Sequence, residues 1–523
     1  MREAGVRVRA KSRSFAPLRM TIVLLVAGAC VLPLLSCSQA ADPNTLVMII
    51  ESSPTDLDPR VGLDAQSERI DELVFDALLT RDEHLNVQPG LAEGWEVPDP
   101  LTYVFHLHRG VTFHDGRSLT SRDVKWTFDS LLQGKIRSTK AATYRFVDRI
   151  DAPDEFIVVF HLKEPYASLL WNLSEGAIGI VPYGALGEMT RKPIGSGPFK
   201  FVSAEPDKEV ILERNDNYWG AKARLSRVRF AVVPDATTRA LELRKGSADV
   251  AINALTPDTL VALEAEPNLR IERGPGTILA YIGFNLRDPV LGDVRVRQAI
   301  ACAIDRGPLL QYIWRGFAQP ASSILPIQSW AYAPGANAFT YNPEIARQIL
   351  DAAGYRLRNG VRFHLTMKTS TEESTRLLAA VLQQQLRDVG IALDIRTFEF
   401  ATFMADVTSG AFQFYSLRWI GNEDPDIFDT VFHTHNFPPA GRNRGFYSNP
   451  RVDSLIDQAR RETDQNVRKR LYAEVQEILA QDVPSINLWY LDNVLVHARR
   501  LRNVSLNPSG NYDFLKTAEI SAQ

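Results

Sequence analysis

The chain contains few cysteines and none of the short motifs that mark several enzyme classes. Only Cys30, Cys37 and Cys302 occur among 523 residues. One function class to consider is that of secreted hydrolases. A secreted hydrolase would be expected to carry a Gly-x-Ser-x-Gly elbow or a His-Glu-x-x-His helix, and the sequence has neither. A Gly-x-x-x-x-Gly-Lys-Ser/Thr phosphate loop is also missing, so the sequence predicts no use of ATP by this chain. We therefore expect a protein that is not an enzyme, without catalytic residues or cofactors.

The chain also lacks a large excess of charge of either sign. The formal net charge is −3, so the sequence lacks the basic field that is typical of nucleic-acid-binding proteins. The first 36 residues nevertheless carry a net charge of +5, which leaves −8 for the remainder. This basic head precedes an uncharged apolar run at 20–35, which is short for a membrane span and is interrupted by Pro33. The pattern predicts a signal peptide over residues 1–36.

The end of the apolar run predicts a lipid anchor. Its last residues, Leu34-Leu35-Ser36-Cys37, resemble the bacterial lipobox, with an aliphatic residue three positions before the cysteine and a small residue directly before it. Cys30 matches less well because Ala27 stands in the aliphatic position. We expect Cys37 to become the lipidated first residue of the mature chain, with residues 37–45 as a tether. Cys302 has no partner for a disulfide and has apolar neighbours, which predicts a buried structural thiol.

The spacing of apolar residues predicts an α/β protein. Alternation at 361–367 and 391–395 indicates strands, 372–389 and 398–409 indicate helices, and 411–420 is strand-like. A strand–helix–strand–helix–strand order implies parallel strands joined by right-handed crossovers. Ligands of such sheets bind beyond the carboxyl ends of the strands. The loop at 419–425 is therefore the first candidate for a ligand surface.

One pair of residues looks reactive but is better explained as scaffold. His114 and Asp115 end an alternating strand, and Asp115 with the following glycine is typical of a turn. Thr120 and Asp123 then have the spacing of a capping box at the start of a helix. We expect His114 to support this turn and to take no part in a reaction.

Six phrases of the sequence together resemble one family. They are GLAEGWEVPDPLTYVFHLHRGVTFHDGRSLTSRDVKWTF, PIGSGPFKFV, LERNDNYWG, VVPDATTRALELRKGSADVAI, FNLRDPVLGDVRVRQAIACAIDR and YSNPRVDSLIDQA. The residues in these phrases, and the order of the phrases along the chain, resemble those of the family 5 extracellular solute-binding proteins of ABC importers, the peptide- and nickel-binding group. The resemblance extends from about residue 46 to beyond residue 515.

The resemblance implies a two-lobed fold like that of periplasmic binding proteins, with mixed sheets flanked by helices and a hinge that the chain crosses twice. Lobe one would comprise 46–279 and 490–523, with an extra subdomain at 76–187, and lobe two would comprise 280–489. The implied function is to capture a peptide or similar polar solute between the lobes and deliver it to a membrane permease with its ATPase subunits. The protein would be a monomer at the periplasmic or extracellular face, would be held there by its lipid anchor, and would have no nucleic-acid partner.

Relatives that bind peptides hold the peptide's amino group with an aspartate in a Trp-x-Gly-Asp loop. The matching loop here begins at Trp419 and carries Asn422 at the aspartate position, so the charge-assisted contact is lost unless Glu423 or Asp424 replaces it. The resemblance gives no match in 365–376 for the arginine with which relatives bind a dipeptide's carboxylate, and Lys368 is the nearest cation. Dipeptide specificity is therefore not predicted, and longer peptides or another solute stay open.

Further candidate ligand contacts lie at two other places. In relatives, the turn after the first strand, here Ser52-Ser53-Pro54, lies at the mouth of the cleft, although a plain turn explains these residues equally well. Tyr281 and Asn285 lie at the first proposed crossing. A sugar, haem or nickel chelate is the alternative cargo, and His433-Thr-His435 is the local feature that favours a metal. Because no third ligand stands nearby in the sequence, we predict no metal site.

Overall fold

The computed structural model describes residues 45–521, apart from 175–177, 335–338 and 440. The predicted signal peptide and the lipidated Cys37 therefore lie outside the described residues. Within the described part of the chain, no helix is long and apolar enough to cross a membrane.

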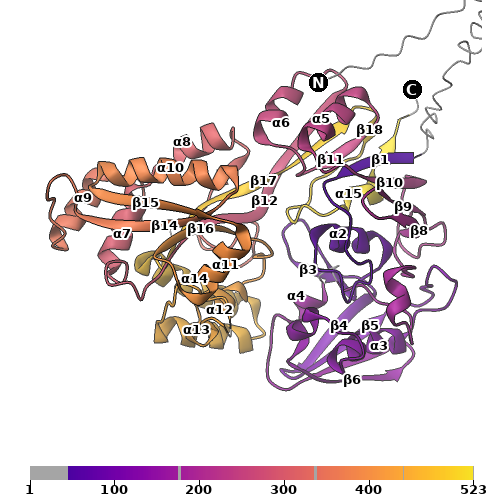
Figure 1. Ribbon diagram of the computed structural model, residues 1–523. Helices are drawn as coiled ribbons and strands as arrows, with labels where there is room; N and C mark the ends of the chain where they lie inside the picture. The colour runs from indigo at the N-terminus through magenta and orange to yellow at the C-terminus, as the bar shows by residue number, and fades with distance from the viewer. Residues whose placement is uncertain (1–44, 175–177, 335–338, 440, 522–523) are drawn as a thin grey trace, which may run out of the picture. The chain divides into compact units, whose positions relative to one another are not determined.

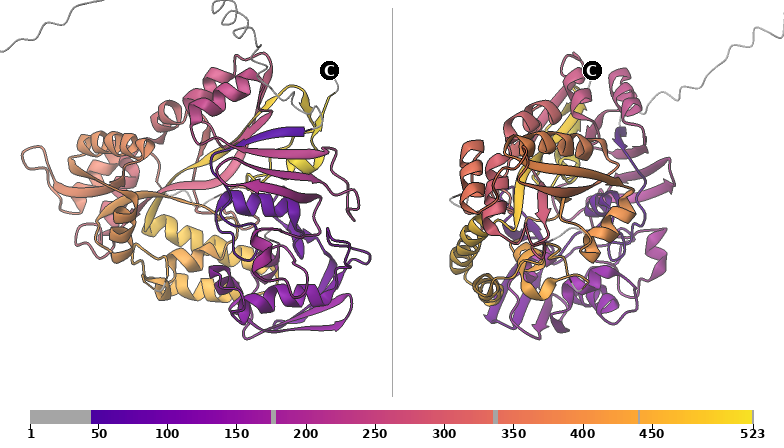
Figure 2. Two further views of the ribbon diagram at one scale, coloured as in Figure 1. Left: turned by 45° about the vertical axis from the view of Figure 1, so that its right-hand side comes forward. Right: turned by 60° about the vertical axis from the view of Figure 1, so that its left-hand side comes forward.

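A mixed sheet of eleven strands is the backbone of the fold, in the order β15-β14-β16-β12-β17-β11-β1-β10-β9-β8, with β13 paired to β17. Its two central strands, β12 (Leu269–Phe284) and β17 (Ser485–Ala498), are long and antiparallel and lie side by side (Figures 1 and 2). The other strands are β1 (Thr45–Ile50), β8 (Phe199–Glu205), β9 (Glu209–Arg214), β10 (Arg227–Val232), β11 (Val250–Ile252), β13 (Ala318–Pro320), β14 (Phe363–Ser370), β15 (Ile391–Phe398) and β16 (Phe414–Trp419).

The two crossings expected from the sequence fall on this central strand pair. One end of β17 pairs with β11, whereas the end of β12 from Leu279 to Phe284 pairs with β16. The register of β12 against β17 shifts between Pro275 and Leu279, so the ladder is interrupted between the two halves of the sheet. Below, lobe one denotes 46–279 with 490–523 and lobe two denotes 280–489, as expected from the sequence.

The strand–helix repeat predicted for 361–420 is confirmed. Helix α10 (Glu373–Asp388) joins β14 to β15, and α11 (Phe400–Ser409) joins β15 to β16. Strand β14 pairs in parallel with both β15 and β16. Leu382 of α10 is fully buried in the same core cluster as Met367 and Ile391, so the apolar face of the helix covers these strands.

Other helices complete lobe two. They are α7 (Val294–Ala303), α8 (Arg306–Pro308), α9 (Pro343–Ala352), α12 (Ile427–Phe432), α13 (Pro450–Arg461) and α14 (Gln465–Asp482), with the one-turn segments η3 (Leu309–Ile313) and η4 (Thr434–Asn436). Cys302 on α7 is a buried free thiol, as predicted, and burial raises its pKa.

Lobe one adds its own helices and small strands. They are α2 (Ala65–Val74), α5 (Ala236–Lys245), α6 (Pro257–Leu263), α15 (Phe514–Thr517), β2 (Leu79–Arg81), β3 (Val87–Pro89), β18 (Leu501–Arg502) and β19 (Glu519–Ile520).

A separate four-stranded antiparallel sheet lies within the predicted extra subdomain (Figure 1). Its order is β4-β5-β7-β6, and α3 packs on it through Phe128, whose ring meets Phe160 edge-on at 5.3 Å. As the sequence predicts, the Asp123 carboxylate accepts a hydrogen bond from Thr120 N at 2.7 Å, which caps α3. The elements are β4 (Ala92–Asp99), β5 (Thr102–Leu107), β6 (Val147–Asp154), β7 (Ile157–Leu162), α3 (Ser121–Leu132), α4 (Leu169–Leu173), η1 (Thr139–Tyr144) and η2 (Gly187–Thr190).

The structure gives His114 a scaffold role. Its Nε2–H donates to the Gly197 carbonyl at 3.0 Å, and its Nδ1 accepts from Gly195 N at 3.3 Å. Both ring nitrogens are satisfied in the neutral form, and burial lowers the pKa of His114 to about 4. The ring therefore fastens the glycine-rich loop to the subdomain and is not a proton carrier.

Two of the phrases that carry the family resemblance, PIGSGPFKFV and LERNDNYWG, both contact the side chain of Asp76. Its carboxylate accepts hydrogen bonds from Ser196 Oγ at 2.8 Å, Tyr218 OH at 2.9 Å and Trp219 Nε1 at 2.9 Å. The loop can approach this closely because it is rich in glycine: a Cβ on Gly195 would lie 2.0 Å from a main-chain oxygen of α2. These phrases therefore maintain the architecture of lobe one.

Candidate functional site

The loop that follows β16 was the first ligand surface predicted from the sequence. Trp419 begins it but is only 6% exposed. Its ring stacks on Tyr281 at 5.4 Å, and the guanidinium of Arg444 lies 5.1 Å from its centroid. Tyr281 is also buried and is hydrogen-bonded to Tyr415. These contacts give Trp419 and Tyr281 a packing role in lobe two, and their contact with ligand stays a prediction.

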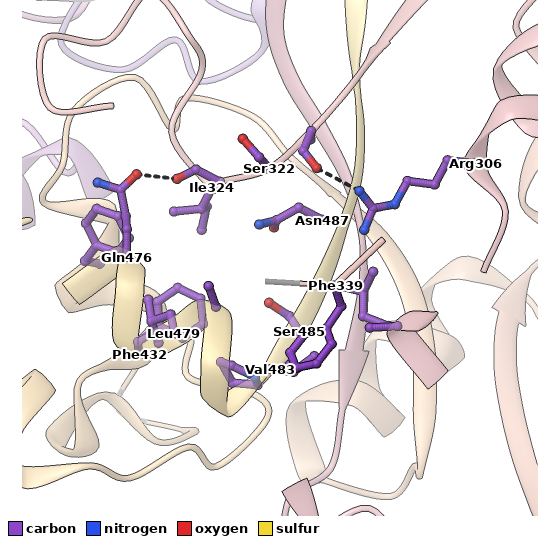
Figure 3. A pocket seen from close by; sticks show the side chains of 17 residues that line it. Arg306, Ser322, Ile324, Phe339, Phe432, Gln476, Leu479, Val483, Ser485 and Asn487 are labelled. Carbon is purple, nitrogen blue, oxygen red and sulfur yellow. Dashed lines mark hydrogen bonds between the residues drawn. The ribbon is translucent and has the colours of Figure 1, made fainter. Parts of the chain in front are cut away.

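Asn422, which stands where peptide-binding relatives carry aspartate, is fully buried. Its Nδ2 donates to the Ile324 carbonyl at 2.5 Å, and its Oδ1 has no hydrogen-bond partner among the described residues. Ile324 also lines a cavity of about 70 Å³ inside lobe two, where Gln476 and Arg306 lie on opposite sides (Figure 3). This volume holds about two waters, too little for a peptide.

Glu423 and Asp424 extend from the same loop to lobe one. Glu423 accepts a hydrogen bond from Thr277 Oγ1 at 2.7 Å and lies 3.9 Å from Arg81 NH1. Asp424 accepts one from Ser168 Oγ at 2.9 Å. Burial raises the pKa of Asp424 to about 6, although Arg468 opposes this rise. Both carboxylates therefore have partners in the protein, and their contact with ligand stays a prediction.

Neighbouring residues extend this set of contacts between the extra subdomain and lobe two. Tyr166 OH donates to Asp426 Oδ2 at 3.1 Å, and Ala167 N donates to the Arg460 carbonyl at 2.9 Å. Arg460 Nε in turn donates to Asp426 Oδ1 at 2.6 Å. We call the contacts of 166–168 with 424–426 and Arg460 the interlobe contact. It joins segments that are more than 250 residues apart in sequence.

A cavity of about 610 Å³ has the size and position of a ligand site. Lobe one contributes residues 253–258, which follow the carboxyl end of β11, and lobe two contributes 372–374, which follow β14, and Arg418 near the end of β16. Its apolar lining includes Leu260, Ile278, Trp314, Phe317 and Leu377. Placement at the carboxyl ends of strands agrees with the general rule that the sequence prediction used.

The polar groups of this cavity were missed by sequence reasoning. Arg418 NH2 lies 2.7 Å from Glu372 Oε1 across the ends of β16 and β14. Hydrogen bonds from Ser374 and Thr375 and the charge of Arg418 lower the pKa of Glu372 against the raising effect of burial. The strand alternation could have found Arg418, because it precedes the buried Trp419 and must face the opposite side of β16.

Comparison with known proteins identifies the family. A sequence model described as "Bacterial extracellular solute-binding proteins, family 5 Middle" matches residues 86–438. The chain belongs to this family. It is 29% identical to di/tripeptide-binding protein 1 of Pseudomonas aeruginosa (strain UCBPP-PA14), over 90% of this chain and 93% of that protein. It is 25% identical to the dipeptide-binding protein of Escherichia coli (strain K12), over 97% and 99%.

Solved structures show the same fold. HbpA2 from Haemophilus parasuis aligns with a TM-score of 0.83 at 25% identity, over 91% of this chain and all of that one. The oligopeptide-binding protein AppA from Bacillus subtilis, solved with a nonapeptide, aligns with a TM-score of 0.74 at 26% identity, over 91% and 99%. The two-lobed α/β fold expected from the sequence is therefore confirmed. The chain is a substrate-binding protein of an ABC importer, and its relatives are binding proteins, not enzymes.

Of the four other candidates in this family 5 protein, Ser53 and Asn285 make local structural hydrogen bonds. Ser53 Oγ accepts a hydrogen bond from Asp207 N at 2.7 Å, and Ser52 and Pro54 lie beside it in the turn after β1. Asn285 Nδ2 donates to the carbonyls of Gly410 and Phe412 at 3.1 and 2.9 Å, which fixes the connection into β16. None of the four lines the 610 Å³ cavity, so their contact with ligand stays a prediction.

The structure places a third possible metal ligand, Asp429, beside His433 and His435. No third ligand was expected near His433 and His435, yet Asp429 brings a carboxylate oxygen within 4.8 Å of both imidazoles. Arg460 already pairs with this carboxylate, with NH1 3.0 Å from Asp429 Oδ1, and His433 Nδ1 accepts from His435 N at 3.2 Å. A guanidinium next to the ligand atoms opposes a divalent cation. We therefore keep the prediction of no resident metal.

Proposed function

We propose that this protein captures a peptide or a similar polar solute in the 610 Å³ cavity and delivers it to the permease of an ABC importer. The observation that carries the proposal is a cavity lined by both lobes at the carboxyl ends of β11, β14 and β16. Relatives named as di/tripeptide-, dipeptide- and oligopeptide-binding proteins support the choice of peptide.

The mechanism follows from a hinge between two rigid parts. A solute that touches both walls of the cavity favours the arrangement in which the lobes meet, and it shifts the equilibrium only by its differential affinity for that arrangement. The interrupted ladder at 275–279 is the place where β12 can bend with the least loss of hydrogen bonds. The interlobe contact would then form on closure and complete the surface that a permease recognises.

Export and anchoring are part of the proposal. Residues 1–36 would direct the chain across the cytoplasmic membrane, and Cys37 would carry the lipid that keeps the protein near the permease and its ATPase subunits. Replacing Cys37 with alanine should move the protein from the membrane fraction to the soluble fraction on cell fractionation. The matched control is Cys302→Ala, which should stay with the membrane. Unchanged membrane retention of Cys37→Ala would contradict the anchor.

The cargo is tested by native mass spectrometry of protein purified without added ligand. A mixture of bound peptides would support the proposal, whereas a single sugar or haem would replace it. Equilibrium dialysis with nickel tests the remaining alternative, because His433→Ala should then abolish retention of the ion. Nickel retained in proportion to protein, with no bound peptide, would assign the protein to metal-chelate uptake.

A further inference from the structure

An ion pair on the wall of the cavity points to the chemistry of the cargo. Arg418 lies at the end of β16, and Glu372 immediately precedes α10, at the point where β14 ends. The two side chains meet at 2.7 Å, yet they remain 34% and 49% exposed. Both line the 610 Å³ cavity, so a solute in the cavity can reach them.

Arg418 has unused hydrogen-bonding capacity. Its two recorded hydrogen bonds, to Glu372 and to Ser374 Oγ at 3.0 Å, both start from NH2. A guanidinium has five N–H donors in a planar fork, which matches the two oxygens of a carboxylate. Nε and NH1 have no recorded partner among the described residues, so this side of the fork is available to an anion.

No other lysine or arginine is found among the described residues that line the cavity. Besides Glu372, three carboxylates line the cavity: Asp258 pairs with Arg315 at 2.8 Å and Asp492 pairs with Arg273, both from outside it, whereas Glu373 has no recorded ion pair among the described residues. Lys368, the nearest cation in the sequence, pairs with Asp406 at 2.6 Å and does not line the cavity. An anionic group of the cargo therefore has one cation to bind.

Resting on the proposed function, we propose that Arg418 binds a free carboxylate of the peptide and that Glu372 is the internal anion with which this carboxylate competes. The bound carboxylate contacts Nε and NH1 while Glu372 keeps NH2. Because two anions then share one cation, Glu372 weakens the binding of every carboxylate, which restricts the site to peptides that make further contacts with both lobes.

The test uses equilibrium dialysis of an Ala-X-Ala tripeptide pool, with X as each of the twenty residues, prepared as free acids and as carboxyl-terminal amides. Wild-type protein should retain the free acids about tenfold more tightly than the amides, a difference typical of one charge-assisted pair. Arg418→Ala should erase this difference, and Arg418→Lys should restore part of it. Glu372→Gln should tighten the free acids several-fold. Arg451→Ala is the matched control because Arg451 pairs with Glu474 at 2.6 Å outside the cavity.

The two sources of carboxylate are separated within the amide pool. Enrichment of its Asp and Glu members would assign Arg418 to an acidic side chain, and preference for the free acids without such enrichment would assign it to the peptide terminus. Equal retention of acids and amides by wild type would overturn the inference and leave the proposed function standing. Retention of neither pool would overturn the inference, and together with the absence of co-purified peptide in the native mass spectrum it would overturn the proposed function as well.

Discussion

Replacing Ser168 with alanine should weaken peptide binding although Ser168 does not line the cavity. Ser168 is 1% exposed and donates from Oγ to Asp424 Oδ1 at 2.9 Å, between the extra subdomain and lobe two. Arg468 NH2 donates to Ser168 Oγ at 3.4 Å. The substitution removes this donor and leaves every residue of the cavity wall unchanged, so a change in affinity reports on the contact between the lobes.

The size of the expected loss of peptide affinity follows from the charge of Asp424, which accepts the hydrogen bond from Ser168. A hydrogen bond to an ionised group contributes about 1.5–3 kcal/mol, and its loss leaves the Asp424 carboxylate with one donor fewer. If the bond exists only when the lobes meet, the free energy of closure decreases by this amount. Since each 1.4 kcal/mol is a factor of about ten, the apparent Kd should rise by about ten- to a hundredfold. This full factor applies where the ligand-free protein is mostly open.

The pH dependence gives a second readout of the same contact. With the lobes in contact, the pKa of Asp424 is about 6, whereas a solvated aspartate has a pKa of about 3.9. Between pH of about 3.9 and about 6, the form with the lobes in contact therefore binds more protons than the open form. Its stability relative to the open form increases as the pH falls through about 6 and does not change above that pH. Affinity should be about tenfold higher at pH 5 than at pH 7.5, and Asp424→Asn should remove this difference.

The assay is dialysis of the Ala-X-Ala pool at both pH values, with urea unfolding of each ligand-free variant. Ser174→Ala is the control, because Ser174 is equally buried and donates to the Trp171 carbonyl at 2.7 Å within the subdomain itself. This control should change stability but not affinity. If Ser168→Ala binds peptide as tightly as Ser174→Ala does, the interlobe contact does not contribute to closure and the reasoning is refuted.

Two further predictions concern the framework of lobe one. Asp76→Ala removes the acceptor of three hydrogen bonds and should lower the free energy of unfolding by about 3 kcal/mol in urea titrations, whereas Asp216→Ala, at an exposed surface pair, should change it by less than about 0.5 kcal/mol. Gly195→Ala should lower the melting temperature by several degrees because its Cβ would lie 2.0 Å from the Val74 carbonyl oxygen. Gly187→Ala meets no atom within 4 Å and should be nearly neutral. Similar melting temperatures for the two glycine variants would contradict this packing argument.

The sequence predicts the strand–helix repeat of lobe two because the signals are local. Apolar alternation gives β14 and β15 directly, and Gly390 and Gly410 follow their helices with positive φ, as helix ends require. The expected helix at 372–389 differs from α10 by one residue at each end. Capping of α3 by Asp123 was predictable for the same reason, since its partner Thr120 stands three residues away.

The candidate site is harder to predict from the sequence because the residues that pair within it are distant from one another in the chain. The rule about carboxyl ends of strands pointed to the loop after β16, but it did not indicate which side chains face the cavity, and Arg418 is the residue next to this loop that lines it. Arg418 meets Glu372, which is 46 residues away, and Asp424 meets Ser168, which is 256 residues away. No local pattern encodes such pairs. The resemblance to peptide-binding relatives favoured Asn422, whose side chain donates to main chain inside lobe two and whose contact with ligand stays a prediction.

One short segment connects recognition of the cargo with closure. Arg418 faces the cavity, and Asp424 and Asp426, at the other end of the same loop, bind the extra subdomain. Between them, Asn422 donates to the Ile324 carbonyl, which ties the loop to the rest of lobe two. Under the proposed function, a solute held by Arg418 and by lobe one would draw the loop toward 166–168, because both contacts lie on one short segment. Coupling of binding to closure therefore needs no long pathway through the protein.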